Sequence, residues 1–99
     1  MEADGFEWDD AKAAANFRKH GVTFGEAATV FDDPLVVTWP DPDHSVDEAR
    51  YLIFGVSKQG KYLVVSYTDR IRLVSARQMT SRERRAYEEW EGQAERRIP

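Results

Sequence analysis

The pattern of hydrophobic and polar positions divides the chain into a helical beginning, a strand-rich middle and a helical end. The first helix is predicted over residues 11–20, where alanine and other good helix formers dominate. Asp9 or Asp10 supplies the N-cap, and Gly21 provides the left-handed stop. Its apolar contacts are expected from Trp8, from Ala14 or Ala15, and from Phe17.

Two more helices are predicted from capping signals. Thr23 and Glu26 have the spacing of a capping box, which starts a short helix over Phe24 to Phe31. Thr80 or Ser81 caps a final helix that runs to about Glu91.

Between these helices the composition favours strands, because β-branched and aromatic residues alternate with turn formers. Four strands are predicted, over residues 35–39, 50–57, 61–68 and 71–77. The links between the last three are too short for parallel pairing, so these strands form an antiparallel meander. The chain is therefore predicted to be an α+β domain with two N-terminal helices, an antiparallel sheet and a C-terminal helix.

Alternation along the strands assigns side chains to the two faces of the sheet. On the last strand, Arg72 is expected to share a face with Val74 and Ala76, and Arg77 to share the other with Leu73 and Ser75. Both faces are partly apolar, so helices are expected to cover the sheet on both sides, at least in part. Residues at strand ends then lie at the rim of that cover: Arg50, Tyr67, Arg70, Arg72 and Arg77.

Length and composition limit the function classes. A chain of 99 residues has room for one domain, over residues 1–99. The absence of cysteine excludes disulfides, thiolate zinc sites and cysteine nucleophiles. The acidic N-terminus does not have the pattern of a signal peptide, and the longest apolar run is too short to cross a bilayer. We therefore expect a cytoplasmic protein that does not contact membranes.

The net charge of −4 hides a strong asymmetry. Residues 1–48 carry −9 and residues 49–99 carry +5, so the second half suits an anionic partner. An ordinary solvated charged surface is the alternative explanation.

A set of short motifs in a fixed order then resembles the BrnT family of toxins. The motifs are Phe6-Glu7-Trp8-Asp9, residues 16–24, residues 27–34, His44-Ser45, Glu48, Arg50, Gly55, residues 71–77, Glu83-Arg84-Arg85 and Tyr87-Glu88. The resemblance implies a ribonuclease toxin of a type II toxin–antitoxin pair with a RelE-like fold and no metal or cofactor. It also implies two partners, RNA and a ribbon-helix-helix antitoxin of the BrnA kind. Toxin and antitoxin are expected to form a heterotetramer that binds operator DNA through the antitoxin.

Metal-free cleavage by attack of the RNA 2′-hydroxyl needs a base, an acid and cationic donors for the phosphate. Within the resemblance, the candidate catalytic residues are Lys19, His44, Glu48, Arg50, Arg72 and Arg77. Guanidinium groups match phosphate oxygens, and the pKa of histidine suits acid or base work near neutral pH. Tyr67 and Arg70 are the candidate RNA-binding residues, with base stacking as the role of Tyr67.

Each candidate also has a plainer interpretation. The two arginines of the last strand could form ordinary ion pairs, as could Glu48 with Arg50. Lys19 could simply neutralise the helix dipole before Gly21, and Tyr67 could be a residue of the core edge. The three tryptophans are expected to be packing residues, and the run Ser81–Arg85 is either a solvated helix face or a contact for an acidic segment of the antitoxin.

A second function class therefore stays open. The acidic balance and the short Asp69-Arg70 link favour a catalytically weak binding module that partners an antitoxin and modulates operon repression.

Overall fold

The computed structural model of the protein describes residues 2–3, 5–33, 36–41, 49–68 and 71–97. Its elements in chain order are β1 (Glu2–Ala3), β2 (Phe6–Glu7), α1 (Asp10–His20), α2 (Phe24–Ala28), the 3-10 helix η1 (Thr29–Asp32), β3 (Val37–Pro40), β4 (Arg50–Val56), β5 (Tyr62–Thr68), β6 (Leu73–Gln78) and α3 (Ser81–Arg97). Among these residues no helix is long and apolar enough to span a membrane.

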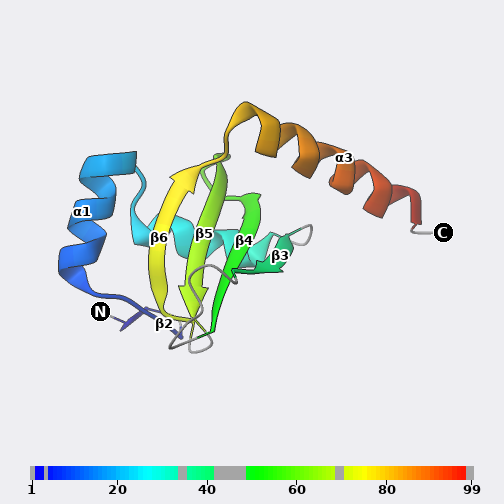
Figure 1. Cartoon of the computed structure of the whole chain (residues 1–99). Coiled ribbons are helices and arrows are strands. Elements are labelled where there is room, and N and C mark those ends of the chain that lie inside the picture. Colours follow the sequence, from blue (N-terminus) through cyan, green and yellow to red (C-terminus); the bar gives the residue numbers. More distant parts are fainter. Residues whose placement is uncertain (1, 4, 34–35, 42–48, 69–70, 98–99) are drawn as a thin grey trace.

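The main sheet has the order β3-β4-β5-β6, and every neighbouring pair is antiparallel. The predicted meander and the α+β class are therefore confirmed, and a fourth strand joins at the β4 edge. Figure 1 shows α2 behind the sheet, α1 beside β6, and α3 leaving the upper end of the sheet and extending away from it. The sheet thus has a face covered by α2 and η1, the helical face, and an opposite face that α3 meets at one corner. We call this second face the open face because no described helix lies across it, although Val64, Ser66 and Thr68 on it are buried.

Helix α1 begins and ends where the sequence predicts. The Asp9 side chain accepts a hydrogen bond from the amide of Lys12 at 3.0 Å, and Gly21 adopts a left-handed φ of 70°. Of the predicted contact residues, Trp8 packs against the core, but Ala14, Ala15 and Phe17 are exposed, so the prediction is wrong for these three. The buried residue of α1 is Asn16.

Asn16 binds the backbone of the edge strand β6. Its side-chain oxygen accepts from the amide of Ala76 at 3.0 Å, and its side-chain nitrogen donates to the carbonyl of Ala76 at 2.8 Å. The same nitrogen donates to the carbonyl of Val22 at 3.0 Å. The carboxamide therefore replaces a neighbouring strand at this position, and it satisfies backbone groups that burial would otherwise leave without partners.

The core lies between the sheet and the helical face. Buried side chains of the segment from Val22 to Val30 pack against Ile53, Leu63, Val65, Leu73 and Ala76. At Gly55 the contact is so close that an added Cβ would lie 2.8 Å from a methyl group of Val30. Gly55 thus allows η1 to pack directly on β4.

The predicted assignment of β6 side chains to faces is wrong at Leu73. Leu73 and Ala76 are both buried on the helical face, although they are three residues apart. A β-bulge between Ser66/Tyr67 and β6 causes this, because the register passes from Ser66↔Ser75 to Tyr67↔Leu73. Arg77 accordingly shares the open face with Ser75, and Leu73 lies on the opposite face.

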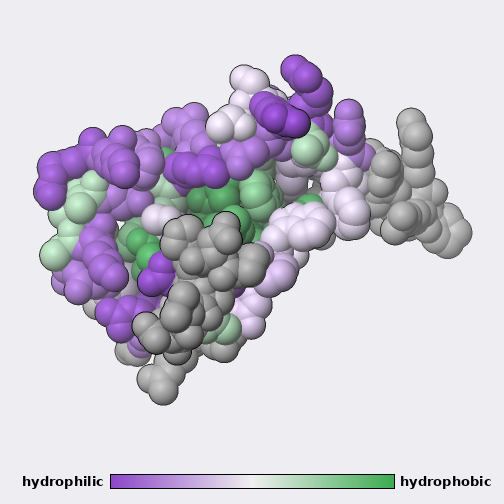
Figure 2. All heavy atoms as spheres, viewed as in Figure 1, coloured by the Kyte–Doolittle hydropathy of each residue, from purple (hydrophilic) through white to green (hydrophobic). Residues whose placement is uncertain are grey.

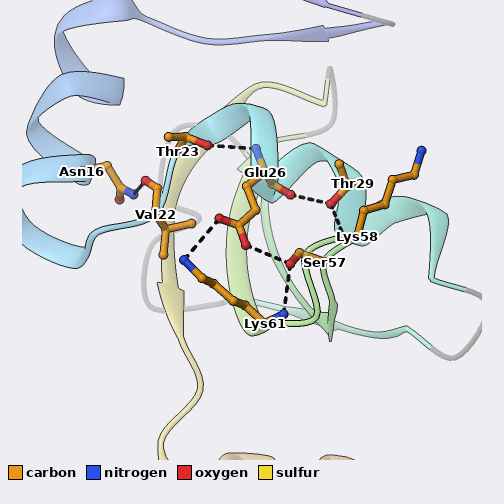
Figure 3. A network of polar contacts seen from close by, with 8 residues as sticks. All are labelled: Asn16, Val22, Thr23, Glu26, Thr29, Ser57, Lys58 and Lys61. Atoms are coloured by element: carbon orange, nitrogen blue, oxygen red, sulfur yellow. Dashed lines mark hydrogen bonds and ion pairs between the residues drawn. The ribbon is translucent and has the colours of Figure 1, made fainter.

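The capping box predicted for α2 is only half formed. The Thr23 hydroxyl accepts from the amide of Glu26 at 3.1 Å. The Glu26 carboxylate instead accepts from the Ser57 hydroxyl at 2.9 Å and lies 3.6 Å from the ammonium group of Lys61 (Figure 3). One turn later, the Thr29 hydroxyl accepts from the amide of Lys58 at 2.9 Å. These contacts attach the β4–β5 hairpin to α2 and η1.

Helix α3 starts with a complete capping box. The amide of Glu83 donates to the Thr80 hydroxyl at 3.1 Å, and the amide of Thr80 donates to the Glu83 carboxylate at 2.9 Å. The helix continues to Arg97, beyond the predicted end near Glu91. The extra turns consist mostly of good helix formers, which carry the helix through Gly92.

Candidate functional site

Two of the predicted catalytic arginines lie at the same end of the sheet. Arg50 begins β4 and is the register partner of Thr68 at the end of β5. The amide of Thr68 in turn donates to the carbonyl of Arg72 at 3.0 Å. Arg50 and Arg72 are therefore two strand spacings apart, about 10 Å, with Thr68 between them.

The Arg72 side chain is exposed, and its ion pair with Glu7 is open to solvent. Its guanidinium lies 3.9 Å from the Glu7 carboxylate of β2, and both side chains are well solvated. An ion pair with these exposures holds its partners weakly. Arg72 is thus available to a phosphate at little energetic cost.

Arg77 occupies a different place from Arg72. Five residues of extended chain separate the two, roughly 15 Å, so they lie at opposite ends of β6. The Arg77 guanidinium makes two hydrogen bonds to the Glu83 carboxylate, of 2.7 and 2.9 Å. The residues predicted to form one rim therefore lie at two separate sites, one around Arg50 and Arg72 and the other at the start of α3.

The bidentate contact fixes the charges of both partners. The Arg77 hydrogen bonds lower the pKa of Glu83 from 4.5 to about 2, with smaller help from the amide of Thr80. The Glu83 contact raises the pKa of Arg77. This geometry connects the end of β6 to the first turn of α3, so Arg77 has a structural role whatever else it contacts.

Lys19 lies in a shallow groove between α1 and β6. The groove has a volume of about 240 Å³, and Lys12, Lys19 and His20 line it on the helix side, opposite Val74 and Ser75. Basic residues in the last turn of a helix also compensate its dipole, and Arg18, Lys19 and His20 all lie there. Lys19 therefore faces the β6 side of the sheet between the two arginine positions.

Tyr67 belongs to an aromatic cluster on the helical face. Its ring centroid is 5.0 Å from that of Phe31 and 5.5 Å from that of Tyr51. Stacking on a base would compete with these packing contacts.

The remaining candidates, His44, Glu48 and Arg70, lie outside the described residues. Within the part of the chain that the structure does describe, no three His, Asp or Glu side chains are grouped as a metal site would require.

Comparison with known proteins decides the family. The sequence model of the ribonuclease toxin BrnT of type II toxin–antitoxin systems matches residues 8–83. The chain belongs to the BrnT family. No curated protein matches the chain as a relative. Membership of the BrnT family confirms the predicted resemblance, and it implies a toxin with a ribonuclease activity and an antitoxin partner.

The BrnT match ends at Glu83, the partner of Arg77. Glu83 was expected only as part of the family motif Glu83-Arg84-Arg85 and not as a partner of Arg77. The Thr80/Glu83 spacing was a usable signal, because a capping box fixes the carboxylate next to the preceding strand end. All three tryptophans were expected to be packing residues. Trp8 does pack against Phe24, but Trp39 and Trp90 are 55% and 45% exposed.

Proposed function

We propose that the chain is an endoribonuclease that cleaves RNA without a metal, by attack of the 2′-hydroxyl on the adjacent phosphate. The main support for this proposal is that Arg50 and Arg72 lie at the same end of the sheet. The chain also belongs to a family of ribonuclease toxins. Two arginines whose strand positions lie about 10 Å apart can direct their guanidinium groups at neighbouring phosphates. The activity belongs to the cytoplasm, where the RNA is.

The other candidates take roles around this arginine pair. Lys19, His44 and Glu48 are the proposed base and acid, and Arg70 and Tyr67 the proposed RNA contacts. Arg77 stabilises the site from the far end of β6 through its contact with Glu83. In this proposal the other candidates contact the RNA, whereas Arg77 positions the start of α3.

The first test is cleavage of a labelled RNA by the purified chain, with and without EDTA, on naked RNA and on ribosomes. We expect products that end in a 2′,3′-cyclic phosphate or the 3′-phosphate, at rates that EDTA leaves unchanged. Loss of activity in EDTA with recovery in Mg²⁺ would contradict the proposal.

The second test is Arg72→Ala. Removal of a donor to the transition state typically lowers the rate about 10²- to 10³-fold. Arg18→Ala is the matched control, because Arg18 is an exposed arginine on α1. Equal RNA cleavage by the folded Arg72→Ala variant and by the control would make Arg72 structural.

The binding-module alternative has one observation in its favour. The Arg77 guanidinium is held by Glu83 and lies roughly 15 Å from Arg72, which leaves fewer cations for one phosphate. A wild-type chain that binds antitoxin tightly but cleaves neither naked nor ribosomal RNA would favour this alternative.

For the partner we propose a ribbon-helix-helix antitoxin whose dimer carries two toxin chains and binds operator DNA. Light scattering on the co-expressed complex tests this, with two chains of each kind expected. A complex with one toxin per antitoxin dimer would exclude the heterotetramer.

A further inference from the structure

A groove runs between the open face of the sheet and the first turns of α3. Its volume is about 400 Å³, and apart from Glu83 its lining is apolar: Val37, Trp39, Phe54, Ala86, Tyr87 and Trp90. The lining residues of α3 recur at the spacing of one helix face. Figure 2 shows the hollow beneath α3, with green hydrophobic atoms in it and purple hydrophilic residues above.

The groove is held open by contacts at its inner end. The Tyr87 hydroxyl donates to the Asp33 carboxylate at 2.7 Å, and the same carboxylate oxygen accepts from the amide of Val56 at 2.8 Å. The ring of Tyr62 packs edge-on against Tyr87 at 5.8 Å. With the Arg77–Glu83 pair, these contacts fix the first two turns of α3, so a ligand meets a preformed site.

The outer end of the groove exposes two tryptophans. Trp39 on β3 is 55% exposed, and Trp90 on α3 is 45% exposed. Such large apolar side chains, grouped on opposite walls of one groove, mark an interaction surface. Tryptophan is also among the residues that contribute most to binding energy in protein interfaces.

The charges beside the groove indicate the nature of its occupant. Arg82 lies one turn before Ala86 on one flank of α3, and it forms no ion pair within the described part of the chain. The start of α3 is therefore positive on this flank, and Glu89 follows two turns later. On the opposite flank Arg84 is neutralised by Glu88 at 2.9 Å. An occupant with acidic residues along one side would complement the positive flank.

We propose that this groove binds an amphipathic helix of the antitoxin, with its apolar stripe between Trp39 and Trp90 and an acidic residue against Arg82. The identity of the partner rests on membership of the type II toxin family, and the position does not depend on the nuclease activity.

The test is titration of the purified cognate antitoxin into toxin variants, followed by calorimetry. Ala86→Glu places a charged side chain in the groove without removing a packing residue, since Ala86 is exposed. Trp90→Ala removes one wall. Each should weaken binding about 10- to 100-fold. Phe17→Ala is the control, because Phe17 is an equally exposed aromatic residue on α1, outside the groove.

A charge reversal adds a second readout. Arg82→Glu should slow association several-fold at low salt, and the difference should shrink as salt rises. A merely structural role for Arg82 would not give this salt dependence.

The outcomes are distinguishable. Wild-type affinity in both groove variants, with circular dichroism showing them folded, would overturn the inference. So would a change in the mass of the free toxin on Trp90→Ala, which would identify a second copy as the occupant. An inactive wild-type chain would overturn the proposed nuclease function and leave the binding measurement intact.

Discussion

Helices α1 and α3 both pack against the sheet, but by different means. Helix α1 uses a buried carboxamide, and the three hydrogen bonds of Asn16 join it to β6 and to the start of the core segment. Helix α3 uses an exposed ion pair and one buried ring, through Glu83 and Tyr87, and its apolar residue Trp90 stays in contact with solvent. Loss of a buried hydrogen-bonded group leaves its partners unsatisfied, whereas water readily replaces an exposed contact.

The α1 junction is therefore expected to contribute most to stability, whereas the α3 junction provides an exposed surface for binding. Substitutions at the α1 junction should lower the stability of the whole chain, and those at the α3 junction should change how α3 is held while the sheet stays intact.

The largest effect is expected for Asn16→Ala. The variant leaves the buried amide and carbonyl of Ala76 without partners, at a cost of about 3 kcal/mol in the free energy of unfolding. Chemical denaturation measures this, and Lys12→Ala on the exposed side of α1 should lower stability by less than about 0.5 kcal/mol. Similar losses in the two variants would show that the carboxamide is not what attaches α1.

Gly55→Ala should have a smaller effect that reaches η1 and α3. Its Cβ would lie 2.8 Å from Val30 and 3.1 Å from the carboxylate of Asp33, which holds Tyr87. Overpacking of this kind lowers stability by about 1–3 kcal/mol. We expect lower thermal stability together with altered Trp90 fluorescence.

The control for that variant is Gly25→Ala. Its added Cβ meets only the Thr23 hydroxyl at 4.0 Å, and alanine favours a helix, so stability should hold or rise. If both variants behave alike, the close approach at β4 is unimportant.

The smallest effect is expected for Glu83→Gln. The folded-state pKa of Glu83 is lowered to about 2, so its ion pair stabilises the wild type above pH 4.5 and is lost as the pH falls toward 2. At pH 7 the variant should be less stable by about 1 kcal/mol or less, because the pair is partly exposed. Stability curves from pH 7 to 2 should therefore converge at low pH.

Glu88→Gln is the comparison for this prediction, because its pair with Arg84 is more exposed. Parallel curves for wild type and Glu83→Gln down to pH 2 would mean that the pair does not contribute.

Local signals predicted the elements well. Asp9, Gly21 and Thr80 fix helix ends through bonds within three or four residues, and such bonds are visible in sequence. The antiparallel meander followed from short links. These features depend on neighbours in the chain.

Features that depend on distant partners were missed. Asn16 and Ala76 are 60 residues apart, so nothing in the α1 pattern indicates that a polar residue is its buried one. The bulge that moves Leu73 to the helical face arises from pairing with β5. The candidate site was predicted incompletely for a related reason. Arg72 and Arg77 are close in sequence, but the extended strand places them roughly 15 Å apart.

The carboxamide of Asn16 has a further consequence for assembly. It occupies the hydrogen-bonding groups of Ala76 on the outer side of β6, where another chain would otherwise add a strand. The opposite edge, β3, exposes Thr38, Trp39 and Pro40. Among the described residues no strand pairs with the outer side of β3, so the sheet can be extended in that direction only. Copies joined edge to edge through β3 would therefore stop at a pair and could not grow into a fibre.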